Sequence, residues 1–366
     1  MQIQIEREKL LPIVTLVAGV VERRQTLPIL SYLLLRADDQ GISLTGTDLE
    51  LEVAAAVEGQ VVESGDTTVP ARKLLDICRA LPEGTDMAML NQDGRVLLKA
   101  GKSRFTLITL PPADFPRVET SKFERVFTIP GRKLKRILES TAFCMAQQDV
   151  RYYLNGLYLE VQEGYIRAVA TDGHRMAVTT EQYNSQSSRV IQIIVPRKAV
   201  QEIMRFLPNS DDPVDITMDT SHLRLEVGGL IATAKLIDGK FPDYTKVIPT
   251  SQSKTIILDQ RQFREGLNRV AILANEKYRG VRLDLQGGKL RITAHNPEQE
   301  EALEEIEINY KGEPLEIGFN VNYLVEAANA INSNEIALGL NDSSSSCTLK
   351  ATDKQDTQYV VMPMRL

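Results

Sequence analysis

Three stretches of the chain repeat one pattern and decide how it is organised: TGTDLELEV (Thr45–Val53), VATDGHRMAV (Val169–Val178) and TAHNPEQEEA (Thr293–Ala302). The polar residue at the centre of each, Asp48, Asp172 and Asn296, recurs at equal steps of 124 residues. A fixed period of this kind is the signature of a repeated structural unit. The sequence therefore predicts three similar domains, residues 1–124, 125–252 and 253–366.

Each predicted domain is a pair of similar halves, because an extended apolar run gives way to a helical pattern six times: IQIEREKLL, TVPARKLLD, TIPGRKLKR, IVPRKAVQE, ILDQRQFRE and GFNVNYLVE. Ile3 and Ile5 alternate with polar residues, as in a half-buried strand, and Leu10, Val14 and Val17 follow at helical spacing. One helix and about four strands per half predict an α+β fold, with helices on one side of antiparallel sheets. The predicted helices are 8–24, 71–81, 131–146, 197–207, 259–274 and 320–331.

The composition is that of an ordinary globular protein, with 43% hydrophobic and 25% charged residues, and it excludes wholesale disorder. The most apolar stretch, residues 10–21, is too short to span a bilayer, and the first residues lack the pattern of a secretory signal. Three scattered cysteines do not make a disulfide framework or a zinc site. We expect a cytoplasmic protein with no membrane contact and no metal.

The charge is distributed unevenly. The chain as a whole carries −6, yet the six predicted helices hold 16 basic and 8 acidic residues, against 27 and 41 in the remainder. Several of the cations, such as Arg72 and Lys198, fall in a first helical turn, where the helix dipole disfavours them. One interpretation is that these side chains extend into water beside acidic neighbours. The interpretation that we favour is that the helices face one polyanion, whose phosphates attract basic residues.

The sequence contains no recognisable catalytic constellation: it has no Walker loop, no nucleophile elbow and no HExxH helix. Asp172 and His174 in TDGHR are the one place where an acid and a histidine sit together. A hydrolase that uses this pair is the alternative to a binding protein, and a duplicated or static DNA-binding scaffold is a further one. We expect no enzymatic activity and no cofactor.

Beyond these patterns, the whole chain resembles the bacterial sliding clamps, the β subunits of DNA polymerase III. The matching segments are TLPIL, LTGTDLE, TVPARK, DICR, LPEG, ADFP, QDVRYYLNG, ATDGHR, VPRK, FPDY, NEKYRGVRL, NPEQEEA, GFNV and YVVMPMRL. The resemblance implies a homodimer closed head to tail into a ring, with helices lining the hole around double-stranded or primed DNA. It implies a non-catalytic processivity factor that tethers the replicative polymerase's catalytic subunit. It also implies the clamp loader, translesion polymerases, mismatch-repair proteins and DNA ligase as partners.

The resemblance also implies two sets of contact residues within one chain. Those that would meet DNA are Arg24, Arg72, Gln148, Tyr152, Tyr153 and Lys198. Because Tyr152 and Tyr153 are consecutive, a strand would point them to opposite faces and expose one of them. A pocket for client peptides would be formed by Arg151, Leu154, Thr171, Gly173, His174, Arg175, Met176, Pro242, Lys246, Val247, Ser344, Ser346, Val360, Val361, Met362, Pro363 and Met364.

Two of these pocket positions, Lys246 and Ser344, depart from the family's usual residues, arginine and an apolar side chain. A third set of residues would form the dimer interface. The first predicted domain would contribute an apolar pair and basic residues, and the third an apolar pair and acidic residues. The set is Lys73, Arg95, Arg104, Phe105, Leu107, Ile272, Leu273, Glu298, Glu300, Glu301 and Glu304.

Overall fold

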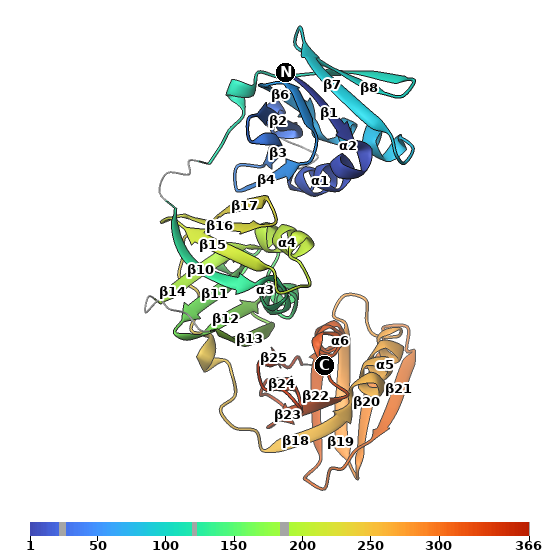
Figure 1. The fold of residues 1–366 in the computed structure, drawn as a ribbon. Coiled ribbons are helices and arrows are strands. Elements are labelled where there is room, and N and C mark those ends of the chain that lie inside the picture. Colours follow the sequence, from blue (N-terminus) through green and yellow to red (C-terminus); the bar gives the residue numbers. More distant parts are fainter. Residues whose placement is uncertain (22–26, 119–122, 184–189, 366) are drawn as a thin grey trace. The chain divides into compact units, whose positions relative to one another are not determined.

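One order of elements occurs six times along the chain: a strand, a helix and three more strands (Figure 1). The computed structural model describes residues 1–21, 27–118, 123–183 and 190–365. Within them a short additional strand, β5 (Gln60–Glu63), follows the first of these halves. The predicted α+β class and the pairing of similar halves are confirmed. The domain boundaries after residues 124 and 252 stay a prediction.

The bounds of the elements follow the repeat. The first domain contains β1 (Gln2–Glu6), α1 (Arg7–Val20), β2 (Tyr32–Asp38), β3 (Gly41–Thr47), β4 (Leu51–Val57), β6 (Gly65–Pro70), α2 (Ala71–Ala80), β7 (Asp86–Gln92), β8 (Arg95–Ala100) and β9 (Ser103–Ile108). The second contains β10 (Glu124–Pro130), α3 (Gly131–Glu139), β11 (Gly156–Gln162), β12 (Gly164–Thr171), β13 (Arg175–Tyr183), β14 (Ile191–Pro196), α4 (Arg197–Phe206), β15 (Pro213–Met218), β16 (His222–Val227) and β17 (Leu230–Lys235). The third contains β18 (Lys254–Asp259), α5 (Gln260–Ala271), β19 (Gly280–Gln286), β20 (Lys289–His295), β21 (Glu301–Glu307), β22 (Leu315–Asn320), α6 (Val321–Ala330), β23 (Glu335–Leu340), β24 (Cys347–Ala351) and β25 (Thr357–Val361).

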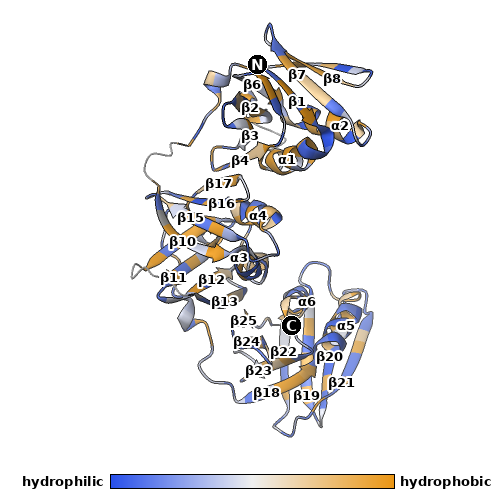
Figure 2. Ribbon diagram, viewed as in Figure 1, coloured by the Kyte–Doolittle hydropathy of each residue, from blue (hydrophilic) through white to orange (hydrophobic). Residues whose placement is uncertain are grey.

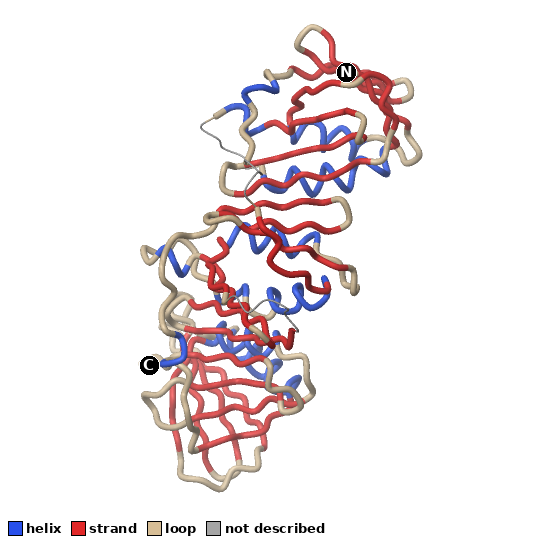
Figure 3. Tube along the Cα trace, turned by 60° about the vertical axis from the view of Figure 1, so that its left-hand side comes forward, coloured by secondary structure: helices blue, strands red, loops and turns tan. Residues whose placement is uncertain are grey.

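The strands form four antiparallel sheets, in the orders β5-β1-β7-β8-β9, β10-β15-β16-β17-β4-β3-β2-β6, β14-β11-β12-β13-β25-β24-β23-β18 and β21-β20-β19-β22 (Figure 3). Within each domain the halves exchange their first strands, so that β1 pairs with β7 and β6 pairs with β2. Two sheets also continue from one domain into the next, through the pairs β4·β17 and β13·β25. The chain divides into two compact units, residues 1–135 with 198–236 and residues 136–197 with 237–366, and each sheet lies within one of them.

The helices bury one apolar face each, as the sequence predicts. On α1 the side chains of Leu10, Val14 and Val17 are fully buried, and the helix packs on α2 and on strands β3 and β4. In the third domain α5 packs in the same way on α6, β20 and β21. Apolar and polar residues are interspersed along the strands (Figure 2), because alternate side chains point to opposite faces.

The six helices all end before their predicted last residues, by one residue for α2, α4 and α6 and by three or more for α1, α3 and α5. Helix α3 stops at Glu139 instead of residue 146, because the hydroxyls of Ser140 and Thr141 donate to the carbonyls of Arg136 and Ile137, and a 3₁₀ turn follows at Ala142–Cys144. Such back-bonding competes with the regular helix ladder. Helix α1 ends at Val20, and residues 22–24 of its predicted C-terminal part lie outside the described residues.

All three cysteines are buried and unpaired. Burial raises the pKa of Cys78 to about 11 and that of Cys347 to about 12, so both are thiols at neutral pH. Along the described part of the chain, no helix combines the length and the apolar composition needed to cross a bilayer.

Candidate functional site

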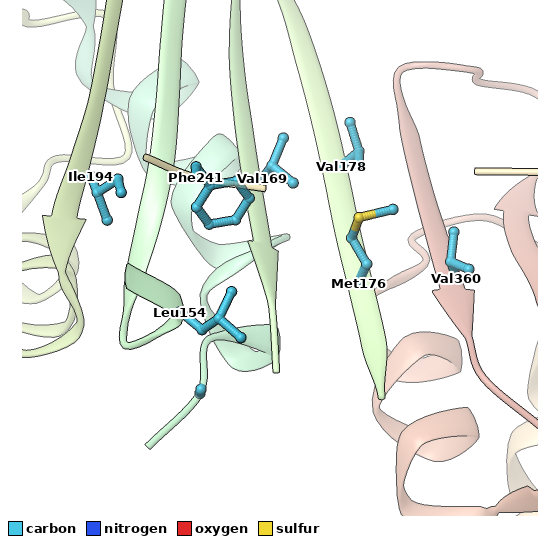
Figure 4. Packing of buried hydrophobic residues seen from close by; sticks show 8 residues of the cluster. Leu154, Val169, Met176, Val178, Ile194, Phe241 and Val360 are labelled. Carbon is cyan, nitrogen blue, oxygen red and sulfur yellow. The ribbon is translucent and has the colours of Figure 1, made fainter. Parts of the chain in front are cut away.

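An apolar cavity of about 190 Å³ opens where β13 pairs with β25. Under it lies a cluster of buried residues that includes Leu154, Met176, Phe241 and Val360 (Figure 4). Met176 and Val360 are directly paired across the two strands, so the central and third domains each supply part of the wall. The complete lining is Arg151, Leu154, Thr171, Gly173, Arg175, Met176, Phe241, Pro242, Tyr244, Val247, Val360 and Met362.

The turn between β12 and β13 forms one wall. Asp172 caps this turn, because its Oδ1 accepts hydrogen bonds from the backbone N–H groups of His174 and Arg175, both at 2.9 Å. Gly173 has a φ of +86°, and a Cβ at this position would lie 2.9 Å from the guanidinium of Arg151. Glycine adopts this backbone conformation without strain, and its lack of a side chain leaves the space that the Arg151 guanidinium occupies.

Arg175 joins the turn to helix α6. Its guanidinium donates to Asp172 (3.1 Å), to the carbonyl of Phe143 (2.9 Å) and to Glu326, and it lies 4.6 Å from the ring centroid of Tyr323. Because this side chain is largely buried and multiply bonded, it holds the cavity wall in one position.

The segment after β17 forms the opposite wall. The ring of Phe241 stacks on Tyr158 of β11 with centroids 5.0 Å apart, and the segment then turns into a 3₁₀ helix at Tyr244–Lys246. Phe241 and Tyr244 line the cavity but were missing from the residues expected from the sequence. The motif FPDY, which contains both, was the available signal.

The cavity gathers ten of the expected client-pocket residues: Arg151, Leu154, Thr171, Gly173, Arg175, Met176, Pro242, Val247, Val360 and Met362. The other seven are outside this lining: His174, Lys246, Ser344, Ser346, Val361, Pro363 and Met364. His174 lines a neighbouring polar cavity of about 510 Å³. Lys246 is exposed and pairs with Asp243 at 3.3 Å, and Ser344 is bonded to Asp342.

A second feature is found at the ends of the three-stranded meanders, the last three strands of each half. In the chain, the last strand of a first half pairs with the last strand of the next domain's second half, as β4·β17 and β13·β25. Among the described strands, β9 and β21 are the two meander ends that remain at a sheet edge. Exposed apolar side chains, Ile108 and Leu303, lie on these edges, and neither was expected from the sequence.

The expected interface residues lie on or near these edges. Ile272, after α5, is 76% exposed, whereas Leu107 on β9 is buried in its own domain. Arg95 and Arg104 are exposed on β8 and β9, Phe105 and Leu273 are half-buried, and Lys73 is exposed on α2. Glu304 on β21 is bonded to Arg269 (2.5 Å), and the exposed acidic residues beside it are Glu298, Glu300 and Glu301.

Comparison with known proteins assigns the family. The models of the DNA polymerase III beta subunit match in order along the chain: the N-terminal domain over residues 1–119, the central domain over 128–243 and the C-terminal domain over 245–365. The chain belongs to the DNA polymerase III beta subunit family. The β sliding clamps of Pseudomonas aeruginosa and Escherichia coli are 50% and 47% identical to it, with complete coverage of both chains in each case.

Solved structures agree with this assignment. A crystal structure of the P. aeruginosa sliding clamp bound to griselimycin is similar with a TM-score of 0.96 at 50% identity, and covers the whole of both chains. The polymerase III beta subunit of Caulobacter crescentus is similar with a TM-score of 0.93 at 37% identity, again over both complete chains. The fold is therefore that of the sliding clamps.

The residues expected to meet DNA differ in how freely the structure exposes them. Arg24 lies outside the described residues. Arg72 is exposed in the first turn of α2, and Gln148 is exposed with a φ of +56°. Lys198 is engaged within the protein, because its ammonium donates to the carbonyl of Val20 at 3.0 Å and to Asp48.

The prediction that Tyr152 and Tyr153 lie on a strand is wrong. They form a 3₁₀ turn, Tyr152–Leu154, because the backbone N–H groups of Leu154 and Asn155 return to the carbonyls of Arg151 and Tyr152. Tyr152 is nevertheless 56% exposed, while Tyr153 packs against the buried cluster under the cavity.

The hydrolase alternative finds no support in the geometry of Asp172. Both carboxylate oxygens are used: Oδ1 caps the turn and Oδ2 accepts from Arg175. The imidazole of His174 stacks against Tyr323, with ring centroids 6.4 Å apart. A carboxylate that is committed to a cap and an ion pair does not serve as a general base.

Proposed function

We propose that this protein is a non-catalytic processivity factor, and that two copies close head to tail into a ring around DNA. The observation that carries the proposal is the pairing rule of the meanders. If the rule continues beyond the chain, β21 of one copy pairs with β9 of a second copy, just as β13 pairs with β25. The same contact, made twice by two copies, closes six domains into a ring with no exposed meander end.

The chemistry of the two edges supports this pairing. The β9 side carries Arg95 and Arg104, and the β21 side carries the exposed carboxylates of Glu300 and Glu301. Because the two edges carry opposite charges, pairing of β9 with β21 is favoured over pairing of either edge with its own copy. The exposed apolar side chains that would be covered between them are Ile108, Ile272 and Leu303.

The distribution of charge supports a duplex as the enclosed ligand. A ring needs contacts to phosphates that carry no base information, so that it can slide. Arg72, in the first turn of α2, and Arg24 would supply such contacts, together with Gln148 and the exposed Tyr152 from the loop before β11. Because a closed ring stays on the DNA that it encloses, its direct contacts with the phosphates can be weak and salt-dependent.

The apolar cavity supports a role as a docking site for client peptides. It is lined mostly by apolar side chains with a few fixed polar groups, as peptide and ligand sites are. The flexible thioethers of Met176 and Met362 suit a pocket that accepts several partners. The clients are the replicative polymerase's catalytic subunit and the clamp loader, and translesion polymerases, mismatch-repair proteins and DNA ligase would share the site.

The decisive test is topological. The protein is loaded on a nicked circular plasmid with its clamp loader, separated by gel filtration, and the plasmid is then cut once. We expect the protein to stay on the circle in moderate salt and to leave the linear form within minutes. Equal retention on both forms would contradict the ring and favour a static DNA-binding scaffold.

A further inference from the structure

The hydroxyl of Tyr244 is turned away from the cavity and is fully bonded behind it. It accepts a hydrogen bond from Arg167 Nη1 at 3.0 Å and donates one to Glu160 Oε2 at 3.2 Å. A phenol has one proton to donate, and here that proton is committed to Glu160. Tyr244 therefore presents its ring to the cavity while its hydroxyl serves the protein interior.

Arg167 and Glu160 are themselves held in place. They are direct cross-strand partners on β12 and β11, with Arg167 Nη1 3.8 Å from Glu160 Oε2. Arg167 also donates to Thr180 Oγ1 at 3.0 Å and lies 4.7 Å above the ring of Tyr165. Glu160 is only 6% exposed. A pair that is fixed on a sheet is a rigid anchor for anything bonded to it.

The segment that carries Tyr244 is attached at both ends, where the N–H of Ile237 donates to the carbonyl of Ile194 (2.9 Å) and the carbonyl of Ser251 accepts from Asn341 (3.0 Å), but it has few attachments between these points. It runs from β17 to β18 without a strand, and it contributes Phe241, Pro242, Tyr244 and Val247 to the cavity. Phe241 is attached by stacking on Tyr158, and Tyr244 by its hydroxyl. Between Ile237 and Ser251 its other hydrogen bonds are local, such as those from Thr245 Oγ1 to Asp243 and from the Val247 N–H to the carbonyl of Tyr244.

We propose that Glu160 and Arg167 are positioning residues that latch the linker between the central and third domains through Tyr244, and thereby set the affinity of the cavity for client peptides. The inference rests on the proposed client-docking function and deepens it. A latched linker presents a preformed wall, so that a client does not have to order it on binding. Burial raises the pKa of Tyr244, which keeps the hydroxyl protonated as the donor at neutral pH.

The test is a double-mutant cycle with Tyr244→Phe and Arg167→Met. The probe is the catalytic subunit of the replicative polymerase, and its affinity for the immobilised full-length chain is measured by surface plasmon resonance. Loss of a hydrogen bond to a charged partner predicts a dissociation constant about five- to tenfold higher for each single variant. Because both changes break the same latch, the double variant should be no weaker than the weaker single variant.

Arg224→Met is the matched control. Arg224 also donates to a threonine on the next strand, Thr233 (3.1 Å), and lies 4.4 Å above an aromatic ring, Phe123, but it has no tyrosine of the cavity as a partner. We expect wild-type affinity from this variant. Hydrogen exchange gives a second readout: the amides of residues 241–248 should exchange faster in Tyr244→Phe, with the rest of the chain unchanged.

Affinities within twofold of wild type, or independent effects that multiply in the double variant, would overturn the latch. If Arg167→Met does not fold, Tyr244→Phe decides alone, since it removes one oxygen atom and keeps the ring. Gly173→Leu, which fills the cavity, separates this inference from the proposed function. If it binds the polymerase as wild type does, the docking site itself is wrong; if it loses binding while Tyr244→Phe keeps it, only the latch is wrong.

Discussion

Two junctions between domains are built on the same backbone plan, yet the apolar cavity proposed to bind client peptides opens at the second of them. At the first, β4 pairs with β17, and at the second, β13 pairs with β25. Asp48 and Asp172, 124 residues apart, cap the equivalent turns, each through two backbone N–H groups at 2.7 to 2.9 Å. The residue after each aspartate has a positive φ, +79° for Leu49 and +86° for Gly173.

The side chains at this one position differ, and the difference explains what each junction can hold. At the second junction Gly173 leaves room for the Arg151 guanidinium beside the cavity. At the first, the equivalent residue is Leu49, which is 51% exposed and adopts its positive φ at some cost in backbone strain. Both junctions thus share one strand-pairing scheme, and we propose that the side chain at this position contributes to whether a junction also binds a partner.

The largest effect is expected at the third junction, which the proposal places between two copies. Ile272→Ala combined with Leu273→Ala removes apolar surface from this contact. Unlike the other two junctions, it would join separate molecules, so no covalent link holds the two surfaces together. We expect folded monomers of about 41 kDa at low micromolar concentration in analytical ultracentrifugation. Ile257→Ala, which changes an exposed isoleucine on the edge strand β18, should leave the dimer intact. A double variant with an unchanged dimer mass would refute the interface.

Exchanging the residues of the two turns tests the comparison directly. Gly173→Leu should lower polymerase affinity by more than about tenfold, which corresponds to about 1.4 kcal/mol. It should also destabilise the protein by about 1–3 kcal/mol through strain at positive φ. Leu49→Gly should keep full polymerase affinity and change stability by less than about 1 kcal/mol, because relief of strain offsets the greater freedom of the unfolded chain. Affinity and urea denaturation are the two measurements, and a loss of binding in Leu49→Gly would break the comparison.

The first junction has its own polar contact, between Lys198 and Asp48, whose side chains are 30% and 6% exposed. Lys198→Met leaves the buried carboxylate with its backbone donors alone, and we expect a loss of about 1–2 kcal/mol in urea denaturation. The exposed Arg72, at the start of α2, should behave in the opposite way. Arg72→Ala should leave stability unchanged but reduce the slope of log K against log salt for DNA binding by about 0.9. A reduced salt slope in Lys198→Met with normal stability would show that this lysine faces DNA instead.

The smallest effect concerns pH. Hydrogen bonds from Arg151 lower the pKa of Asp149 to about 2. The first junction lacks this arginine, because the residue 124 positions earlier is Leu27. Because the folded-state pKa is depressed, the pair stabilises the fold above the ordinary pKa of 3.8 and loses this contribution as the pH falls towards 2. An NMR titration of the Asp149 carboxyl should show that midpoint, and Arg151→Met should return it towards 3.8. A midpoint near 3.8 in the unaltered protein would show that the pair does not form.

The sequence by itself determined the repeated architecture. Strand and helix periods are local properties, so Ile3 and Ile5 indicated a strand and Leu10, Val14 and Val17 a helix without knowledge of any neighbour. The 124-residue step of Asp48, Asp172 and Asn296 then placed equivalent turns in each domain. Ten residues of the cavity lining were also expected, because the motifs that contain them resemble those of a known family.

Only the tertiary structure decided which distant segments meet. The sequence does not tell that β4 pairs with β17, that Lys198 reaches Asp48 from 150 residues away, or that Tyr244 is bonded to Glu160. Nor did the sequence show that Tyr152 begins a 3₁₀ turn, since the alternating pattern of a strand does not predict where the strand begins or ends. Each of these outcomes depends on contacts between chain segments that no local pattern encodes, and the apolar cavity is assembled from such contacts.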